Sequence, residues 1–124
     1  GRFGAHSGEK NDARRGELLA SDEGACHIGE VALVPASSPI SRSGVLFYNT
    51  LFDENAACHI AFGAGYPGTI QGGTAMTREQ RQALGMNDSA IHEDVMVGSS
   101  DMDITGLTAD GQTVQIFKKG EWAF

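Results

Sequence analysis

Glycine interrupts this sequence at short intervals, and its spacing limits what the chain can fold into. The 124 residues include 17 glycines, which lie between short apolar runs such as 31–34 and 45–48. Because glycine destabilises the interior of a helix or a strand, short elements joined by tight turns are favoured over long ones. Since 40% of the residues are apolar, the chain can still bury one core. These features predict a mixed α+β fold, with short helices beside a compact mixed sheet.

The order of apolar and turn-forming residues predicts a polar, Gly-rich lead-in at 1–12, expected to be frayed, followed by one domain at 13–124. Asp53 is the expected N-cap of one helix, and a capping box at Thr77 opens another. The expected helices cover 13–29, with a break or turn at Gly24, and also 54–62 and 77–85. The expected strands cover 31–34, 45–48, 90–97 and 102–107, with a terminal hairpin over 113–117 and 122–124 that turns at Lys119-Gly120. The serine-rich stretch 36–44 is expected to be a loop.

The charge balance argues against some functions. Nine basic and 16 acidic residues give a formal net charge of −7. The basic residues form no patch beyond the pairs Arg14-Arg15 and Lys118-Lys119, so no nucleic-acid partner is expected. No apolar run has the length of a transmembrane helix and no secretory leader is visible, so no membrane partner is expected.

The clearest local signal for chemistry is His92-Glu93-Asp94, within the predicted strand 90–97. Residues two apart on a strand share a face, so His92 and Asp94 project together while Glu93 points the other way. An imidazole beside a carboxylate is half of a site for zinc, cobalt or manganese. The same spacing also suits a surface pair, or an aspartate that only orients a histidine. The apolar residues expected to pack on the opposite face are Ile91, Val95 and Val97.

A second group of polar residues runs from Asp53 to His59. Glu54 and His59 are five apart, so on a regular helix they point about 140° apart; one metal could not easily take both, but two could. Asn55 could instead orient His59, and a capped helix with a packed histidine needs no metal. Glu30 directly precedes an apolar run and is placed to enter a site at strand ends, or simply begins a strand at the surface.

Nucleophilic catalysis is less well supported. Cys58 and His59 are neighbours, but consecutive helical residues point about 100° apart, so they do not form a Cys-His pair. The sequence contains no GxSxG elbow, P-loop or dinucleotide-binding fingerprint. Cys26 and Cys58 have neither CxxC nor zinc-finger spacing, so both are expected to be buried, reduced thiols, with a disulfide between them as the unsupported alternative.

Four segments, taken together and in order, carry a family resemblance. They are residues 22–34, 52–63, 87–99 and 120–124. They resemble the thermophilic metallo-aminopeptidases of the aminopeptidase T and aminopeptidase S type, from about residue 15 to the end. The resemblance implies an enzyme that uses two divalent metal ions to release N-terminal amino acids from peptides. It also implies a cytoplasmic location and zinc or cobalt as the metal, with magnesium and manganese as alternatives.

The same resemblance implies roles for individual residues. The metal ligands it implies are Glu30, Glu54, His59, His92 and Asp94. The catalytic residues it implies are Glu30 and Tyr66, which lies seven residues after His59. A further glutamate ligand and the N-terminal domain of the family belong to an upstream part that this sequence lacks, and the full enzymes are homodimers. This chain alone is therefore expected to be impaired or inactive.

Two other functions remain open at the level of sequence. The chain could be a non-catalytic metal-binding or dimerisation module, or an acidic structural domain without a metal. Metal analysis separates the last of these from the others, and a peptidase assay separates an enzyme from a module.

Overall fold

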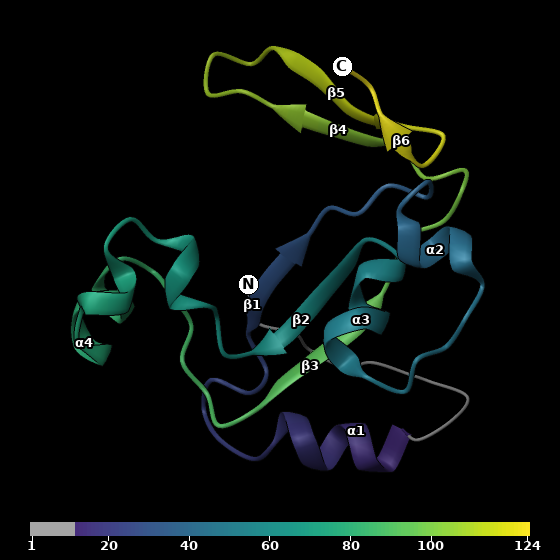
Figure 1. Ribbon diagram of the computed structural model, residues 1–124. Coiled ribbons are helices and arrows are strands. Elements are labelled where there is room, and N and C mark those ends of the chain that lie inside the picture. Colours follow the sequence, from purple (N-terminus) through teal and green to yellow (C-terminus); the bar gives the residue numbers. More distant parts are fainter. Residues whose placement is uncertain (1–11) are drawn as a thin grey trace. The chain divides into compact units, whose positions relative to one another are not determined.

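The computed structural model describes residues 12–124, which form short helices and two small sheets (Figure 1). The predicted α+β class is confirmed. Most of the predicted lead-in, residues 1–11, lies outside the described residues. The chain forms two compact units. The first contains the described residues through Val31 together with Ile60–Val95, and the second contains Ala32–His59 and Met96–Phe124.

The first sheet has the order β1-β2-β3, with β1 at Ile28–Ala32, β2 at His59–Gly63 and β3 at His92–Met96. The amide of Gly63, at the end of β2, donates to the carbonyl of His27, just before β1. The amide of Ala64 donates to the carbonyl of Ile91, just before β3. Since the end of β2 meets the start of both neighbours, the strands are antiparallel. Helix α1, at Asp12–Leu19, precedes this sheet in the chain.

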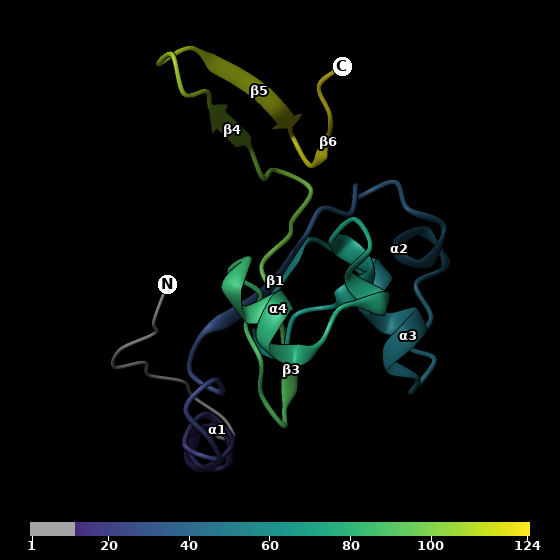
Figure 2. The same ribbon diagram turned by 90° about the vertical axis from the view of Figure 1, so that its left-hand side faces the viewer.

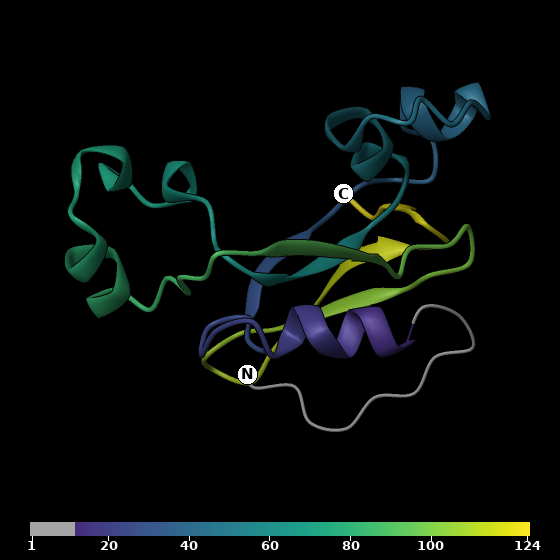
Figure 3. The same cartoon turned by 90° about the horizontal axis from the view of Figure 1, so that it is seen from below.

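The stretch between β2 and β3 leaves the sheet as an excursion at one end, visible in Figures 1 and 3. It holds the short 3-10 turns η2 (Pro67–Thr69) and η3 (Gly73–Ala75) and helix α4 (Arg78–Ala83). The capping box predicted at Thr77 is present, because the Thr77 hydroxyl accepts from the Gln80 amide while the Gln80 side chain accepts from the Thr77 amide.

Glycine allows the strand ends of the first sheet to approach one another. Gly63 has φ of +94°, and a Cβ placed on it would lie 2.1 Å from the carbonyl oxygen of Ile91. A Cβ placed on Gly29 would lie 2.2 Å from the carbonyl oxygen of Gly63. Neither position can hold a side chain without moving backbone. The Asn87 amide group reinforces this junction by donating to the carbonyls of Gly24 and Gly63, at 2.8 and 2.6 Å.

The second unit contains α2 (Pro39–Ser43), α3 (Thr50–Asp53) and η1 (Glu54–Ala56), followed later by a second sheet of order β4-β5-β6. Strands β4 (Ile104–Leu107) and β5 (Thr113–Lys118) pair antiparallel, and the chain turns back into β6 (Glu121–Trp122), as Figure 2 shows. The predicted turn at Lys119-Gly120 is confirmed, with φ of 51° and 74° at these residues. Phe117 is fully buried beside the Trp122 ring.

Several predicted elements are wrong in extent. The helix expected over 13–29 ends at Leu19. The chain turns because the Asp22 carboxylate accepts from the amides of Ala25 and Ala90. The strand expected over 31–34 occupies Ile28–Ala32 instead, and Val31 is 67% exposed rather than buried.

Other predictions fail in the type of element. The expected loop 36–44 contains α2, because Ser38 caps it and Pro39 opens it. The run 45–48 forms no strand, since Tyr48 has φ of 55° and leaves the extended conformation. Residues 54–62 are not one helix; α3 and η1 end by Ala56 and β2 begins at His59.

The remaining expectations concern single residues and the membrane. The strand predicted over 90–97 is confirmed over His92–Met96 as β3, but Ala90 and Ile91 lie before its start, and Val97 lies beyond its end and is half-exposed. The cysteines Cys26 and Cys58 are free, as expected; the buried Cys58 thiol hydrogen-bonds both the amide and the carbonyl of Val34. Among the described residues, no helix has the length and apolarity needed to cross a bilayer.

Candidate metal centre

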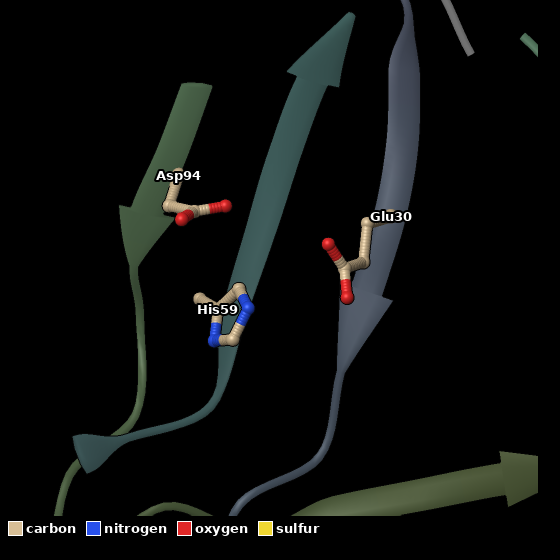
Figure 4. A group of neighbouring side chains, drawn as sticks. All are labelled: Glu30, His59 and Asp94. Atoms are coloured by element: carbon tan, nitrogen blue, oxygen red, sulfur yellow. The ribbon is translucent and has the colours of Figure 1, made fainter. Parts of the chain in front are cut away.

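Three predicted ligands meet on one face of the first sheet, one from each strand. Glu30 comes from β1, His59 from β2 and Asp94 from β3 (Figure 4). One nitrogen or oxygen atom of each lies within 4.8 Å of the others. Figure 4 shows both carboxylates directed toward the middle strand, where the His59 ring stands. His59 is 3% exposed, so the imidazole is shielded from bulk water.

His92 joins the same two carboxylates. Its Nε2 lies 3.1 Å from Oε2 of Glu30 and 3.3 Å from Oδ1 of Asp94. The short distance to Asp94 agrees with the expectation that these two residues of β3 project together. Two imidazoles therefore adjoin the same pair of carboxylates, so four of the five predicted ligands come together.

Backbone carbonyls orient both histidines. Nδ1 of His92 lies 2.7 Å from the carbonyl oxygen of Ala64, and Nδ1 of His59 lies 3.1 Å from that of Ala57. A carbonyl oxygen can only accept, so each Nδ1 carries the hydrogen and donates it. In the neutral ring this leaves Nε2 with a free lone pair. A metal-binding histidine is commonly held in this way, through its other ring nitrogen.

The cluster of two carboxylates and two imidazoles is better suited to binding a cation than to forming a hydrogen-bonded network. Nε2 of His92 and Oδ1 of Asp94 are buried, and neither makes a hydrogen bond although they are 3.3 Å apart. This is expected where two lone pairs face each other. Buried polar atoms normally find partners, and two nearby carboxylates repel when both are ionised. A divalent cation would satisfy all of these atoms, and a nitrogen and oxygen donor set suits zinc, cobalt or manganese.

The other two predicted site residues lie differently. The ring of Tyr66 is centred 4.7 Å from the His92 ring, and Tyr66 is about half exposed. Tyr66 therefore borders the group. Glu54 lies in η1, five residues before His59, and is not a member of the ligand group found among the described residues. The helical geometry used to compare Glu54 with His59 does not apply, because His59 stands on a strand.

Sequence reasoning missed the backbone that supports the site. The carbonyl that holds His92 belongs to Ala64, which follows directly after Gly63. Gly63 and Gly65, on either side of Ala64, are both buried, and their amides donate to the carbonyls of His27 and Asn87. The available signal was the pair of glycines directly after an apolar segment, which often marks a close backbone approach.

The family described as thermophilic metalloprotease (M29) matches residues 1–122. The chain belongs to the M29 family.

Individual M29 relatives are aminopeptidases by name and are much longer. Aminopeptidase AmpS of Bacillus subtilis (strain 168) is 53% identical over 116 residues, which cover 94% of this chain and 28% of the relative. Aminopeptidase 2 of Geobacillus stearothermophilus is 53% identical over 107 residues, which cover 86% of this chain and 26% of the relative. The solved structure of wild-type AmpT from Thermus thermophilus has a TM-score of 0.80 and 46% identity, covering 94% of this chain and 28% of that one. The chain thus spans little more than a quarter of these relatives.

Proposed function

We propose that this chain is the metal-binding C-terminal part of a metallo-aminopeptidase that releases N-terminal amino acids from peptides. The observation that carries the proposal is the convergence of two histidines on one pair of carboxylates, Glu30 and Asp94. The names of the M29 relatives support the reaction class, since they are aminopeptidases.

The proposed ligands are Glu30, Glu54, His59, His92 and Asp94, for two divalent ions, zinc or cobalt. Such ions supply Lewis acidity, which polarises a peptide carbonyl and makes a nearby water more acidic. The two carboxylates adjoin both imidazoles, so either of them could serve two cation positions. The carbonyls of Ala64 and Ala57 keep the Nε2 lone pairs directed at those positions.

Glu30 and Tyr66 are the proposed catalytic residues. Glu30 is a carboxylate in contact with His92, about one quarter exposed at its side chain, so it can exchange a proton with a water that enters from solvent. Tyr66 stands against the His92 ring, and its hydroxyl can donate to a carbonyl oxygen as negative charge develops there.

The proposal includes parts that this chain does not contain. An upstream portion is proposed to supply a further glutamate ligand and part of the substrate cleft, and the complete enzyme is proposed to be a cytoplasmic homodimer. The match to only 28% of AmpS fits this view. Alone, the chain should release amino acids from a chromogenic amino-acyl substrate orders of magnitude more slowly than a complete M29 enzyme, because substrate orientation is lost.

The test is to replace the matching part of Bacillus subtilis AmpS with this chain and to assay the resulting full-length enzyme under zinc or cobalt. We expect turnover, and Tyr66→Phe should reduce kcat by about a hundredfold or more while leaving the metal content unchanged. The control is Thr113→Val, which also removes one hydroxyl group, from β5. It should retain full turnover.

Two outcomes would contradict the proposal. A folded chimera that binds metal without turnover would favour the non-catalytic module. A chimera whose Tyr66→Phe variant keeps its kcat would remove Tyr66 from the catalytic residues.

A further inference from the structure

The segment that follows α2 and runs into the first residues of α3 displays large apolar side chains to solvent. We call residues 45–52 the apolar loop. The exposed fractions in it are 62% for Leu46, 89% for Tyr48 and 73% for Leu51. The other exposed members are Val45, Phe47 and Phe52. Single exposed apolar residues are ordinary, but six exposed apolar side chains within eight consecutive residues mark an interaction surface.

The apolar loop is held in a defined conformation. The Asp53 carboxylate accepts from the amides of Phe47 and Asn49, at 2.9 and 3.0 Å. The Asn49 side chain caps α3 by accepting from the Leu51 amide. The rings of Phe47 and Phe52 lie 5.5 Å apart. A surface whose shape is already formed binds a partner with a smaller loss of conformational entropy.

The backbone of the loop also carries strain. Tyr48 has φ of 55°, a left-handed conformation that side chains other than glycine rarely adopt. The other positive-φ residue of this kind in the described part of the chain is Lys119, which the hairpin turn explains. No turn between paired strands explains Tyr48. Its conformation projects a tyrosine that is almost fully exposed, and such strain is concentrated at binding and active sites.

We infer that the apolar loop is the docking surface for the remainder of the M29 chain. The inference rests on the proposed function in one respect, namely that this chain works as part of a longer enzyme. The M29 relatives extend well beyond the matched region, which is 28% of AmpS and of the solved AmpT chain. An apolar surface of this kind is normally buried in a complete protein, and the rest of the same enzyme is present at the highest effective concentration.

Docking at this loop has a consequence for the metal centre. The loop leads through Asp53 directly into Glu54, the one proposed ligand that lies outside the group around Asp94. A partner that packs on the loop would contact the turn that carries Glu54, and it could thereby set the position of that carboxylate.

The experiment uses the AmpS chimera described above, with a protease site at the junction before this chain. The chimera is cleaved after folding, and the two pieces are followed by size-exclusion chromatography at decreasing concentration in metal-free buffer. We expect the parent pieces to stay together. In the double variant Leu51→Ser, Phe52→Ser, the two pieces should dissociate at a concentration at least about a hundredfold higher than the parent pieces do, as expected on losing two central apolar anchors.

The matched control is Leu107→Ser on β4, which removes an equally exposed leucine. It should not change the dissociation. A second measurement needs no substitution: amide exchange at 47–53 should be slower in the cleaved complex than in the isolated chain. Neither measurement depends on bound metal or on turnover. A negative result would therefore contradict the docking surface without contradicting the proposed aminopeptidase activity.

Three results would overturn the inference. The first is unchanged exchange at 47–53 while other segments become protected. The second is equal dissociation of the parent and the double variant. The third is a concentration-dependent dimer of the isolated chain that the double variant abolishes, because the occupant would then be a second copy.

Discussion

Residues 90–97 and 53–63 each carry two of the proposed metal ligands, but local sequence describes only the first segment well. In 90–97 His92 and Asp94 stand two residues apart between apolar residues, and β3 forms with these two side chains in contact on one face. In 53–63 an expected N-cap at Asp53 and a stop at Gly63 suggest a helix, yet the chain forms a helical turn, a 3-10 turn and then strand β2. Only His59 of this second segment reaches the ligand group.

The difference comes from where the deciding interactions lie. Residues two apart on a strand share a face whatever the strand pairs with, so the placement of His92 beside Asp94 is a local property. Strand β2 is the middle strand of its sheet, so its conformation is decided by hydrogen bonds to β1 and β3, which are distant in sequence. Tertiary pairing of this kind overrides a weak helical propensity. A ligand on such a strand cannot be placed by counting residues along a helix.

The largest predicted effect tests whether the two segments contribute equally to metal binding. In the isolated chain, Asp94→Ala should weaken zinc or cobalt binding at least tenfold, roughly the smallest loss expected when a ligand or its direct support is removed. His92→Ala should do the same. Glu54→Ala should bind like the parent, because Glu54 lies outside the group. Isothermal titration calorimetry measures all three affinities.

Two results would contradict the predicted difference in metal binding between the two segments. If Asp94→Ala and His92→Ala both bind metal like the parent, the ligand assignment on β3 is wrong. If Glu54→Ala loses as much affinity as Asp94→Ala, then η1 already supplies a ligand in the isolated chain. The docking surface would then not be needed to position Glu54.

Much of the fold followed from the sequence where the signals are local. The capping box at Thr77, the turn at Lys119-Gly120 and strand β3 were all predicted. The grouping of Glu30 with Asp94 was not derivable from spacing, because they are 64 residues apart and meet only through sheet pairing. The family resemblance named them together without indicating which strands hold them. Their role as metal ligands stays a prediction.

A smaller effect concerns the backbone junction that supports His92. Gly63→Ala should destabilise the chain by about 1–3 kcal/mol, because the residue has a positive φ and its new Cβ would meet the Ile91 carbonyl. Gly111→Ala isolates the part of the destabilisation that comes from backbone conformation, since Gly111 has φ of +83° and no atom lies within 4 Å of a Cβ placed on it. Gly68→Ala, in open space, should be close to neutral. Urea unfolding should rank the three variants in this order, and equal losses for Gly63→Ala and Gly111→Ala would mean that the close approach is unimportant.

The smallest effect concerns the start of β3 and depends on pH. The amide of Ala90 lowers the pKa of the Asp22 carboxyl below its ordinary value; partial burial opposes this, and the Ser89 hydroxyl adds to the lowering. A carboxyl whose pKa is lower in the folded state stabilises the fold above its unfolded pKa, and this contribution is lost as pH falls through the folded pKa. Asp22→Asn cannot ionise, so it should be less stable than the parent above about pH 5, and the difference should shrink below about pH 4. Urea midpoints measured across this range, with the α1 variant Glu17→Gln as control, should show the convergence only for Asp22→Asn. A stability difference that stays constant with pH would mean that the charge of Asp22 does not hold the start of β3 to the turn that contains Asp22. The hydrogen-bond geometry alone would then do so.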